Sequence, residues 1–248
     1  MKIVITGSRG FIGGHLKNTY KEYGHEIIEW DHHIDKPIEN FIINRKGFSE
    51  VDYVIHMAAW ADVRKSIEEP DIYWENNVTN TTRIQRQCYE YNIPLIYASS
   101  SCIHEWYKSP YGISKKVNEE TAFPGQVALR FTTVYGGAGA QRGMFMDNLK
   151  DGSLKWVTNH IRDFVHINDV ISAITLLMNL DFDELKPAYD IGTGQGYIVS
   201  ELAKAGGYDV EGVEGDECEA LDNTADITAI KELGWEPTID VLEYIKQL

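Results

Sequence analysis

Cysteine is scarce in this chain of 248 residues. The three cysteines, Cys88, Cys102 and Cys218, are odd in number and widely spaced. This spacing is typical neither of a disulfide framework nor of a zinc site built from paired thiols, so we expect three reduced thiols. Long apolar runs are also missing, because none approaches the ~20 residues of a membrane helix, and no signal peptide precedes the structured sequence. We therefore expect a cytoplasmic location.

Positive charge is also in short supply. The chain has 23 lysines and arginines against 38 aspartates and glutamates, which gives a net charge of −15. Nucleic acids and anionic membranes are recognised through basic surfaces, so neither is an expected partner. Any phosphate that binds must be held by a local feature. The 43% of hydrophobic residues is typical of a globular protein.

The first half of the chain alternates short apolar runs with segments of helical length. Continuous apolar runs without polar alternation are typical of parallel strands that are buried on both faces. The predicted strands are 2–6, 26–30, 52–56, 95–99 and 127–131, and the predicted helices between them are 11–23, about 73–91 and 111–122. This alternation predicts an α/β fold with a doubly wound parallel sheet.

The signals become mixed after residue 136. Segments 144–150, 168–180, 225–233 and 239–248 are predicted to be helical, and 188–192 is predicted to be a short strand. We place a boundary between a first domain, 1–132, and a second region, 133–248. Part of 163–192 is expected to return to the first layer.

Three glycines follow the first predicted strand in the sequence TGSRGFIG. Gly7 permits a tight turn, Gly10 lets backbone approach a pyrophosphate, and Gly13 lets the helix pack on the sheet. The free N–H groups at the helix start, at Phe11 and Ile12, favour an anion. Asp31 ends the second strand, where a carboxylate accepts hydrogen bonds from a ribose 2′-hydroxyl and repels a 2′-phosphate. The pattern predicts an NAD-binding domain of Rossmann type.

Tyr111 and Lys115 stand one helical turn apart, so they share a helix face. A phenol with a pKa near 10 becomes a base at neutral pH only if roughly 4 kcal/mol favours the phenolate. The Lys115 ammonium and the positive nicotinamide ring are the two cations that could supply this stabilisation. The pair opens a helix shortly after residues 99–101, at the carboxyl edge where open α/β sheets bind ligands. This position predicts a catalytic tyrosine with a supporting lysine.

Eight further stretches occur in order along the chain. They are HMAAWADVRKSIEEP at 56–70, NNV at 76–78, SSSCI at 99–103, SPYGISK at 109–115, LRFTTVYG at 129–136, RDFVHINDV at 162–170, DIGTG at 190–194 and LGWEP at 233–237. With the glycine loop they resemble the extended short-chain dehydrogenase/reductase superfamily, and within it the NAD-dependent nucleotide-sugar epimerase/dehydratase family. The resemblance covers nearly the whole chain, although several connections are shorter than is usual in that family.

The resemblance implies roles for further residues. Met57, Ala58 and Ala59 would pass alongside the cofactor, and Asn77 would support the hydrogen-bond network of the active site. Ser100 would supply the catalytic hydroxyl beside Tyr111 and Lys115. In the second region, a small substrate-binding part, Thr133 and Arg162 would contact the substrate. A homodimer is expected, because family dimers pack the helices near 73–91 and 111–122 into a four-helix bundle.

The implied activity is 4-epimerisation of a UDP-sugar, which passes through a transient 4-keto sugar and regenerates NAD. One alternative is a keto-sugar reductase, or a 3,5-epimerase/4-reductase similar to GDP-fucose synthase, with Cys102 as an acid or base. Another is a dinucleotide-binding protein without turnover. Ser101 and Cys102 stand where dehydratases of the family carry an acidic pair, which disfavours 4,6-dehydration.

The substrate half departs from the family pattern. Thr133 stands where an asparagine is usual, and segment 211–216 lacks the usual arginine, so one ligand of the substrate diphosphate is missing. Asp62, Arg64 and Glu68/Glu69 are interpreted as a solvated face that includes one or two substrate-lining side chains, and the sequence does not choose among them. Asp31, His32 and His33 lack the spacing of a structural zinc site, so no metal is expected.

Overall fold

The computed structural model describes residues 1–42, 50–138 and 144–248. A six-stranded sheet forms its centre, with the order β2-β1-β3-β4-β5-β9, and every pair of neighbours is parallel. The strands are β1 (Lys2–Thr6), β2 (Glu26–Trp30), β3 (Tyr53–His56), β4 (Leu95–Ser100), β5 (Gln126–Phe131) and β9 (Ala188–Ile191). The predicted doubly wound parallel sheet is confirmed, and β9 adds a late segment of the chain to it.

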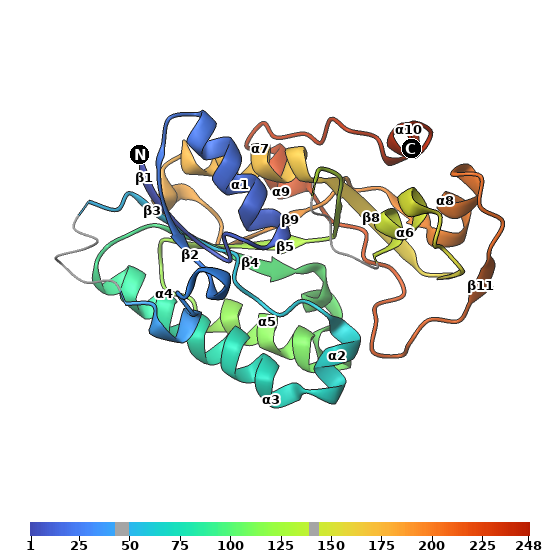
Figure 1. Cartoon of the computed structure of the whole chain (residues 1–248). Helices are drawn as coiled ribbons and strands as arrows, with labels where there is room; N and C mark the ends of the chain where they lie inside the picture. Colours follow the sequence, from blue (N-terminus) through green and yellow to red (C-terminus); the bar gives the residue numbers. More distant parts are fainter. Residues whose placement is uncertain (43–49, 139–143) are drawn as a thin grey trace.

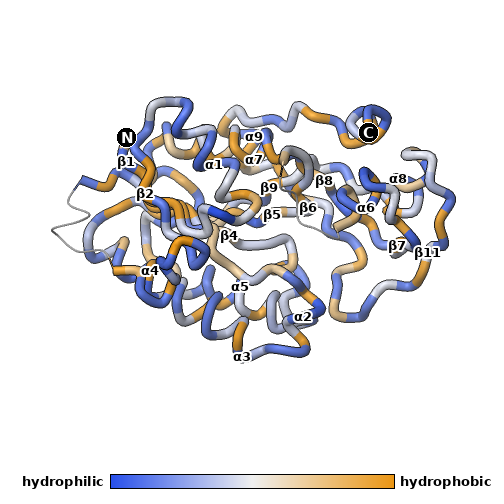
Figure 2. The backbone as a smooth tube through the Cα atoms, viewed as in Figure 1, coloured by the Kyte–Doolittle hydropathy of each residue, from blue (hydrophilic) through white to orange (hydrophobic). Residues whose placement is uncertain are grey.

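Helices cover both faces of this sheet (Figure 1). On one face α1 (Phe11–Glu22) and α7 (Ile167–Met178) enclose a core that contains Ile5, Leu16 and Ile174. On the other face α4 (Asn80–Glu90) and α5 (Pro110–Glu120) lie with the short α2 (Val63–Glu68) and α3 (Pro70–Tyr73). The apolar strands lie between these layers in Figure 2, and the side chains of the inner strands β1, β3, β4 and β5 are mostly buried, as the continuous apolar runs predict. The run 26–30 differs, because β2 lies at the edge of the sheet and its side chains are exposed or half-buried.

The helix predicted near residues 73–91 has a different internal geometry. It consists of α3, a π-helical segment η3 (Trp74–Thr79) and α4. A π-helical turn widens the backbone and often occurs at functional sites. The widened turn contains Asn77, which is fully buried.

The second region builds smaller sheets beside the carboxyl edge of the large one. β6 (Thr133–Tyr135), β8 (Ile161–His166) and β10 (Gly196–Ile198) form a three-stranded sheet, and β7 (Trp156–Thr158) pairs with β11 (Glu211–Val213). Around them lie α6 (Phe145–Asp151), α8 (Val199–Ala205) and α10 (Val241–Ile245), while α9 (Thr228–Lys231) packs near β9. Their apolar side chains form a separate core around Tyr135, Leu149 and Phe164. The boundary at residue 132 stays a prediction.

Short 3-10 helices complete the described chain: η1 (His32–Ile34), η2 (Ile38–Asn40), η4 (Ser101–Lys108) and η5 (Phe182–Glu184). Within the residues that the structure describes, no helix combines the length and the apolar character needed to cross a membrane.

Candidate functional site

The glycine loop between β1 and α1 has no room for side chains at two of its three glycines. Gly7 has a φ of +66°, and a Cβ there would lie 2.7 Å from the backbone nitrogen of Ala58. A Cβ on Gly13 would collide with the carbonyl oxygen of Gly7. These contacts bring the start of α1 directly against the ends of β1 and β3. The roles predicted for Gly7 as a turn and for Gly13 as a packing contact have a physical basis here.

Gly10 differs, because a Cβ there would meet only the Gly7 carbonyl, at 3.2 Å, among the described neighbours within 4 Å. Gly10 is also the N-cap of α1, and no described side chain caps this helix. The first N–H groups of a helix have no acceptor within it, including those of Phe11 and Ile12. The absence of a side chain at Gly10 beside uncapped N–H groups fits a dinucleotide pyrophosphate.

Asp31 connects the end of β2 to the glycine loop. Its carboxylate accepts hydrogen bonds from the backbone N–H of Arg9 at 2.9 Å and from that of His33 at 2.9 Å. The side chain is almost fully buried. This fixed carboxylate at the end of the second strand suits the ribose hydroxyls of NAD.

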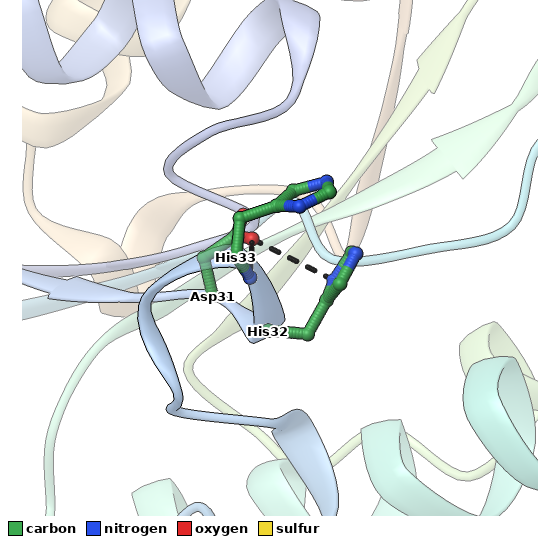
Figure 3. A group of neighbouring side chains, drawn as sticks. All are labelled: Asp31, His32 and His33. Carbon is green, nitrogen blue, oxygen red and sulfur yellow. Dashed lines mark hydrogen bonds and ion pairs between the residues drawn. The ribbon is translucent and has the colours of Figure 1, made fainter.

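The imidazoles of His32 and His33 lie beside Asp31, and this group is a candidate metal site (Figure 3). Ligand atoms of Asp31, His32 and His33 lie within 4.8 Å of one another, and both histidines are exposed. The carboxylate oxygens already accept backbone hydrogen bonds, so two adjacent exposed imidazoles are the remaining ligands in this group. Structural zinc requires a closed set of four ligands. The absence of a metal stays a prediction.

Residues 57–59 follow β3 and lie against the glycine loop. The N–H of Met57 donates to the carbonyl of Thr6 at 3.1 Å, and the N–H of Ala58 donates to the Thr6 hydroxyl at 3.3 Å. His56, at the end of β3, is buried with its ring nitrogens 2.6 Å from the Thr6 hydroxyl and 2.9 Å from that of Thr81. Burial lowers the pKa of His56 to about 3, so this imidazole is neutral at pH 7.

Asn77 joins three parts of the site. Its side chain accepts a hydrogen bond from the N–H of Trp60 at 2.9 Å and donates one to the carbonyl of Trp60, also at 2.9 Å. A further bond of 3.3 Å reaches the hydroxyl of Ser114 in α5. The segment after β3 and the helix that carries Tyr111 are therefore held by one buried amide. This arrangement agrees with the supporting role expected for Asn77.

Ser100, Tyr111 and Lys115 come together at the carboxyl edge of the sheet. Ser100 ends β4, and its hydroxyl lies close enough to the Tyr111 phenol to lower the pKa of that phenol. The ammonium of Lys115 is buried, donates to the carbonyl of Ala98 at 2.8 Å and lies 5.6 Å from the centre of the Tyr111 ring. Tyr111 therefore has both a hydroxyl and a cation in its neighbourhood.

The start of α5 fixes this arrangement. The hydroxyl of Ser109 caps the helix by accepting the N–H of Gly112 at 3.0 Å, and Pro110 occupies the first turn. A Cβ on Gly112 would lie 2.7 Å from the carbonyl oxygen of Trp106 in η4. A glycine at this position lets α5 approach η4 closely enough to bring Tyr111 beside Ser100.

Burial shifts the pKa values of Tyr111 and Lys115 in opposite directions. It raises the pKa of the Tyr111 phenol above its ordinary value and lowers the pKa of Lys115 to about 8. The nearby Ser100 hydroxyl lowers the phenol pKa but does not offset burial. In the chain alone the phenol is protonated at neutral pH, so the expected phenolate requires a further positive charge in the site.

Cys102 lies beside the same group. Its backbone N–H donates to the Ser100 hydroxyl at 3.2 Å, and its thiol interacts electrostatically with Tyr111 and Arg162. Burial raises the pKa of this thiol, which is therefore protonated at neutral pH.

The substrate-side residues Thr133 and Arg162 lie in the neighbouring three-stranded sheet. The Thr133 hydroxyl accepts a hydrogen bond of 3.4 Å from the amide of Asn223. The guanidinium of Arg162 donates to the carbonyl of Ala220 at 2.8 Å and to the carboxylate of Glu219 at 3.0 Å. Arg162, the phosphate ligand expected from the motif, is thus already bound by an acidic side chain.

A cavity of about 590 Å³ opens beside this pair. Its lining residues are Lys108, Asn159, His160, Glu214, Gly215, Asp216, Glu217, Glu219 and Leu221. His160 contacts both Arg162, at 2.7 Å, and Glu219, at 3.3 Å. The sequence did not indicate His160 or Glu219, because neither belongs to a motif with assigned chemistry. It included Arg64, which pairs with Glu219 at 2.7 Å, only within an undivided solvated face.

Comparisons with known proteins find relatives that match nearly the whole chain. A putative UDP-glucose 4-epimerase of Methanocaldococcus jannaschii is 28% identical over 299 aligned positions, which cover 99% of this chain and 96% of the relative. The structure of the Thermotoga maritima UDP-glucose 4-epimerase with UDP-glucose has a TM-score of 0.81 at 26% identity and covers 99% of this chain and 96% of that one. The structure of MoeE5 with UDP-glucuronic acid and NAD has a TM-score of 0.86 at 24% identity, with 99% and 97% covered, and shows the same fold.

Family membership follows from a match over most of the chain. The model of the NAD dependent epimerase/dehydratase family matches residues 3–192, which include the glycine loop, Ser100, Tyr111 and Lys115. The predicted family and the predicted cofactor, NAD, are confirmed at this level. The chain belongs to the NAD dependent epimerase/dehydratase family.

Proposed function

We propose that this protein is an NAD-dependent nucleotide-sugar 4-epimerase that acts on a UDP-linked hexose or uronic acid. The observation that carries the proposal is the buried group of Ser100, Tyr111 and Lys115 beside the glycine loop. The resemblance to UDP-glucose 4-epimerases supports the choice of substrate class.

The dinucleotide would bind across the carboxyl edge of the sheet. Gly7, Gly10 and Gly13 would admit the pyrophosphate to the start of α1, where the N–H groups of Phe11 and Ile12 have no acceptor within the helix. Asp31 would accept the ribose hydroxyls. Met57, Ala58 and Ala59, which lie against the glycine loop, would line the nicotinamide side, and Asn77 would hold that segment in place.

Bound NAD supplies a hydride acceptor and a positive charge close to the phenol. Tyr111 would remove the proton from the sugar 4-hydroxyl, and Ser100 would share a hydrogen bond with the same oxygen. Lys115 would hold the nicotinamide ribose and favour the phenolate. Thr133 and Arg162 would bind the sugar and its phosphates. The 4-keto sugar formed in this way would turn over in the site before its other face is reduced.

Product analysis tests this proposal. The purified protein would be incubated with UDP-glucose and with UDP-glucuronic acid, and the 4-epimers would be resolved by NMR. We expect epimer formation with no net consumption of added NADH. If protein that is shown to hold NAD forms neither epimer, the proposal is contradicted and the dinucleotide-binding alternative is favoured.

A second candidate, a keto-sugar reductase with an epimerase step, rests on the position of Cys102. Its protonated thiol lies beside Ser100 and within electrostatic reach of Tyr111, where it could donate a proton to a carbon next to a carbonyl. A reductase consumes NADH in proportion to product, and its activity would depend on this thiol. A Cys102→Ala variant that keeps full 4-epimerase activity would exclude this role.

A further inference from the structure

Two arginines from distant parts of the chain share one carboxylate beside the cavity. The Nε of Arg64, in α2, lies 2.7 Å from one oxygen of Glu219, and the Nη2 of Arg162, in β8, lies 3.0 Å from the other. The side chains of Arg162 and Glu219 are only 15% and 19% exposed. A largely buried carboxylate therefore bridges two guanidinium groups, with one oxygen for each.

Neighbouring charges complete this arrangement. Asp216 contributes a second carboxylate, 2.7 Å from the Nε of Arg64. Lys108 brings a third cation to the cavity wall, with its ammonium 3.4 Å from the backbone oxygen of Glu219. The guanidinium of Arg162 is largely buried and requires opposite charge nearby, whereas the Arg64 side chain is 43% exposed. Glu219 and Asp216 meet this requirement in the chain alone, and an incoming anion could meet it in their place.

The position of the two arginines relates them to the proposed chemistry. The thiol of Cys102 interacts electrostatically with Arg162 and Glu219 and also with Tyr111. Glu219, which binds both arginines, also lines the cavity of about 590 Å³. Cavities of roughly 300–1,000 Å³ commonly hold small ligands. Figure 1 shows the segment after β11 passing toward α2, which brings Glu219 to Arg64.

We infer that Arg64 and Arg162 form a two-guanidinium clamp for the diphosphate of the substrate, and that Glu219 occupies this clamp until the diphosphate displaces its carboxylate. Guanidinium groups bind carboxylates and phosphates through the same fork of N–H donors. Arg64 would then replace the arginine that is usual in the family but missing from segment 211–216, and would supply the second cation for the diphosphate. This inference rests on the proposed nucleotide-sugar substrate and adds a binding residue to it.

Hydrogen bonds fix the backbone that follows Glu219. When the Glu219 carboxylate is displaced, the acidic segment 214–219 therefore moves and strand β8 does not. The N–H of Ile161 donates to the carbonyl of Leu221 at 2.8 Å, and the N–H of Asp163 donates to the side chain of Asn223 at 2.7 Å. These bonds hold residues 221–223 against β8. Arg162 therefore keeps its position in the strand while the Glu219 carboxylate leaves.

Calorimetric titration of the NAD-bound protein with UDP tests the clamp. We expect Arg64→Ala to weaken UDP binding about 10- to 100-fold, because a charged hydrogen-bond donor is lost. Glu219→Gln should strengthen UDP binding by about three- to tenfold, because a neutral amide competes less well for the arginines. Lys65→Ala is the matched control, since Lys65 follows Arg64 but pairs with Glu69. The control should bind UDP as the wild type does, and all variants should bind NAD equally.

Each result distinguishes this inference from the proposed function. Wild-type UDP affinity in Arg64→Ala would overturn the clamp and leave the proposed function intact. Weaker UDP binding in Glu219→Gln would overturn the displacement. A wild-type protein that binds no UDP or UDP-glucose would overturn the proposed function, and inorganic pyrophosphate would then test the clamp alone. Loss of pyrophosphate affinity in Arg64→Ala would support the clamp, whereas an unchanged affinity or no binding to the wild type would overturn it.

Discussion

The phenol of Tyr111 illustrates how one residue depends on its surroundings. A tyrosine four residues before a lysine is a common pattern, and position at the sheet edge gives this pair its significance. In the folded chain burial raises the phenol pKa, and the Lys115 ammonium 5.6 Å from the ring centre does not overcome it. The remaining stabilisation of the phenolate must come from charge that binds in the site.

Replacing Tyr111 with phenylalanine removes the proposed base and leaves the ring in place. We expect kcat for 4-epimerisation to fall about 10²- to 10⁴-fold, the usual contribution of a positioned base. Release of NAD from the denatured variant, measured by absorbance, should match that of the wild type. Near-normal turnover with a confirmed substrate would disprove the proton-transfer role.

Asp31 is expected to select between NAD and NADP. Asp31→Arg replaces a carboxylate that repels a 2′-phosphate with a cation that binds one, so the ratio of NADP to NAD affinity should rise by about tenfold or more. Fluorescence titration with the reduced dinucleotides measures this ratio. Glu39→Arg, a change to an exposed residue in η2, is a control for added charge. If the ratio of NADP to NAD affinity were the same in both variants, Asp31 would not select between the two dinucleotides.

Because His56 is buried, we expect the stability of the fold to decrease in acid. Its folded pKa of about 3 lies below the ordinary value of 6.5, so the unfolded state binds more protons between these values. The free energy of unfolding should therefore fall as pH decreases from about 6.5 toward 3, by up to ~1.4 kcal/mol per pH unit from this group.

His56→Gln keeps polar atoms near Thr6 and Thr81 but does not titrate. Urea unfolding at several pH values should give a shallower pH dependence for this variant than for the wild type, whatever its stability at pH 7. Parallel curves for the two proteins would mean that His56 does not cause the acid sensitivity.

At the scale of elements, close backbone approach decides which helices deliver side chains to the site. α5 reaches η4 because Gly112 has no side chain, and Ser109 caps its first turn. Gly112→Val would force α5 away from the backbone of Trp106, and Tyr111 and Lys115 would move with it. We expect kcat to fall by about tenfold or more while NAD stays bound. Glu120→Val introduces the same side chain at an exposed position of α5, and it should keep the catalytic geometry.

Helix periodicity predicted the existence of the long helix on this face but not its π-helical turn. Segment 73–91 has helical length, and the described chain is helical from α3 through α4. The extra residue in the turn aims Asn77 at Trp60 and Ser114, which are remote in sequence. A pattern within one helix carries no information about such partners, so the widened turn could not be expected.

For the whole molecule, one buried carboxylate ties the substrate region to the large sheet. Asp163, in β8, is fully buried and accepts hydrogen bonds from the backbone of Thr193, Gly194 and Ala225 at 2.8 to 3.2 Å, as well as from the Thr193 hydroxyl. These partners belong to the segment after β9 and to the segment before α9. A single side chain thus fixes how the late parts of the chain return to the first layer.

Asp163→Ala would leave these buried donors without their acceptor. We expect the free energy of unfolding to decrease by about 2–5 kcal/mol, measured by urea denaturation. Asp226→Ala, a change to an exposed aspartate that accepts one hydrogen bond from Thr228, should cost less than about 1 kcal/mol. An equal decrease in the free energy of unfolding for the two variants would show that Asp163 does not hold the substrate region to the large sheet.

The homodimer remains a prediction at this scale. Trp74 is half exposed, and with Pro70, Pro110 and Ile113 it lines a shallow groove where α3 meets α5. These helices carry the surface that the family resemblance assigns to dimers. Sedimentation analysis of the purified protein would decide between a monomer and a dimer.

The sequence by itself determined the sheet, the glycine loop and the Tyr111–Lys115 pair, because these depend on local spacing and on apolar runs that are buried wherever they occur. It also placed Ser100 at the end of a strand whose carboxyl end the parallel sheet brings to the ligand-binding edge. Only the tertiary structure decided that Arg64 and Arg162 meet at Glu219, since 155 residues separate Arg64 from that glutamate. Contacts between remote charges depend on how the chain returns, and no local pattern encodes that path.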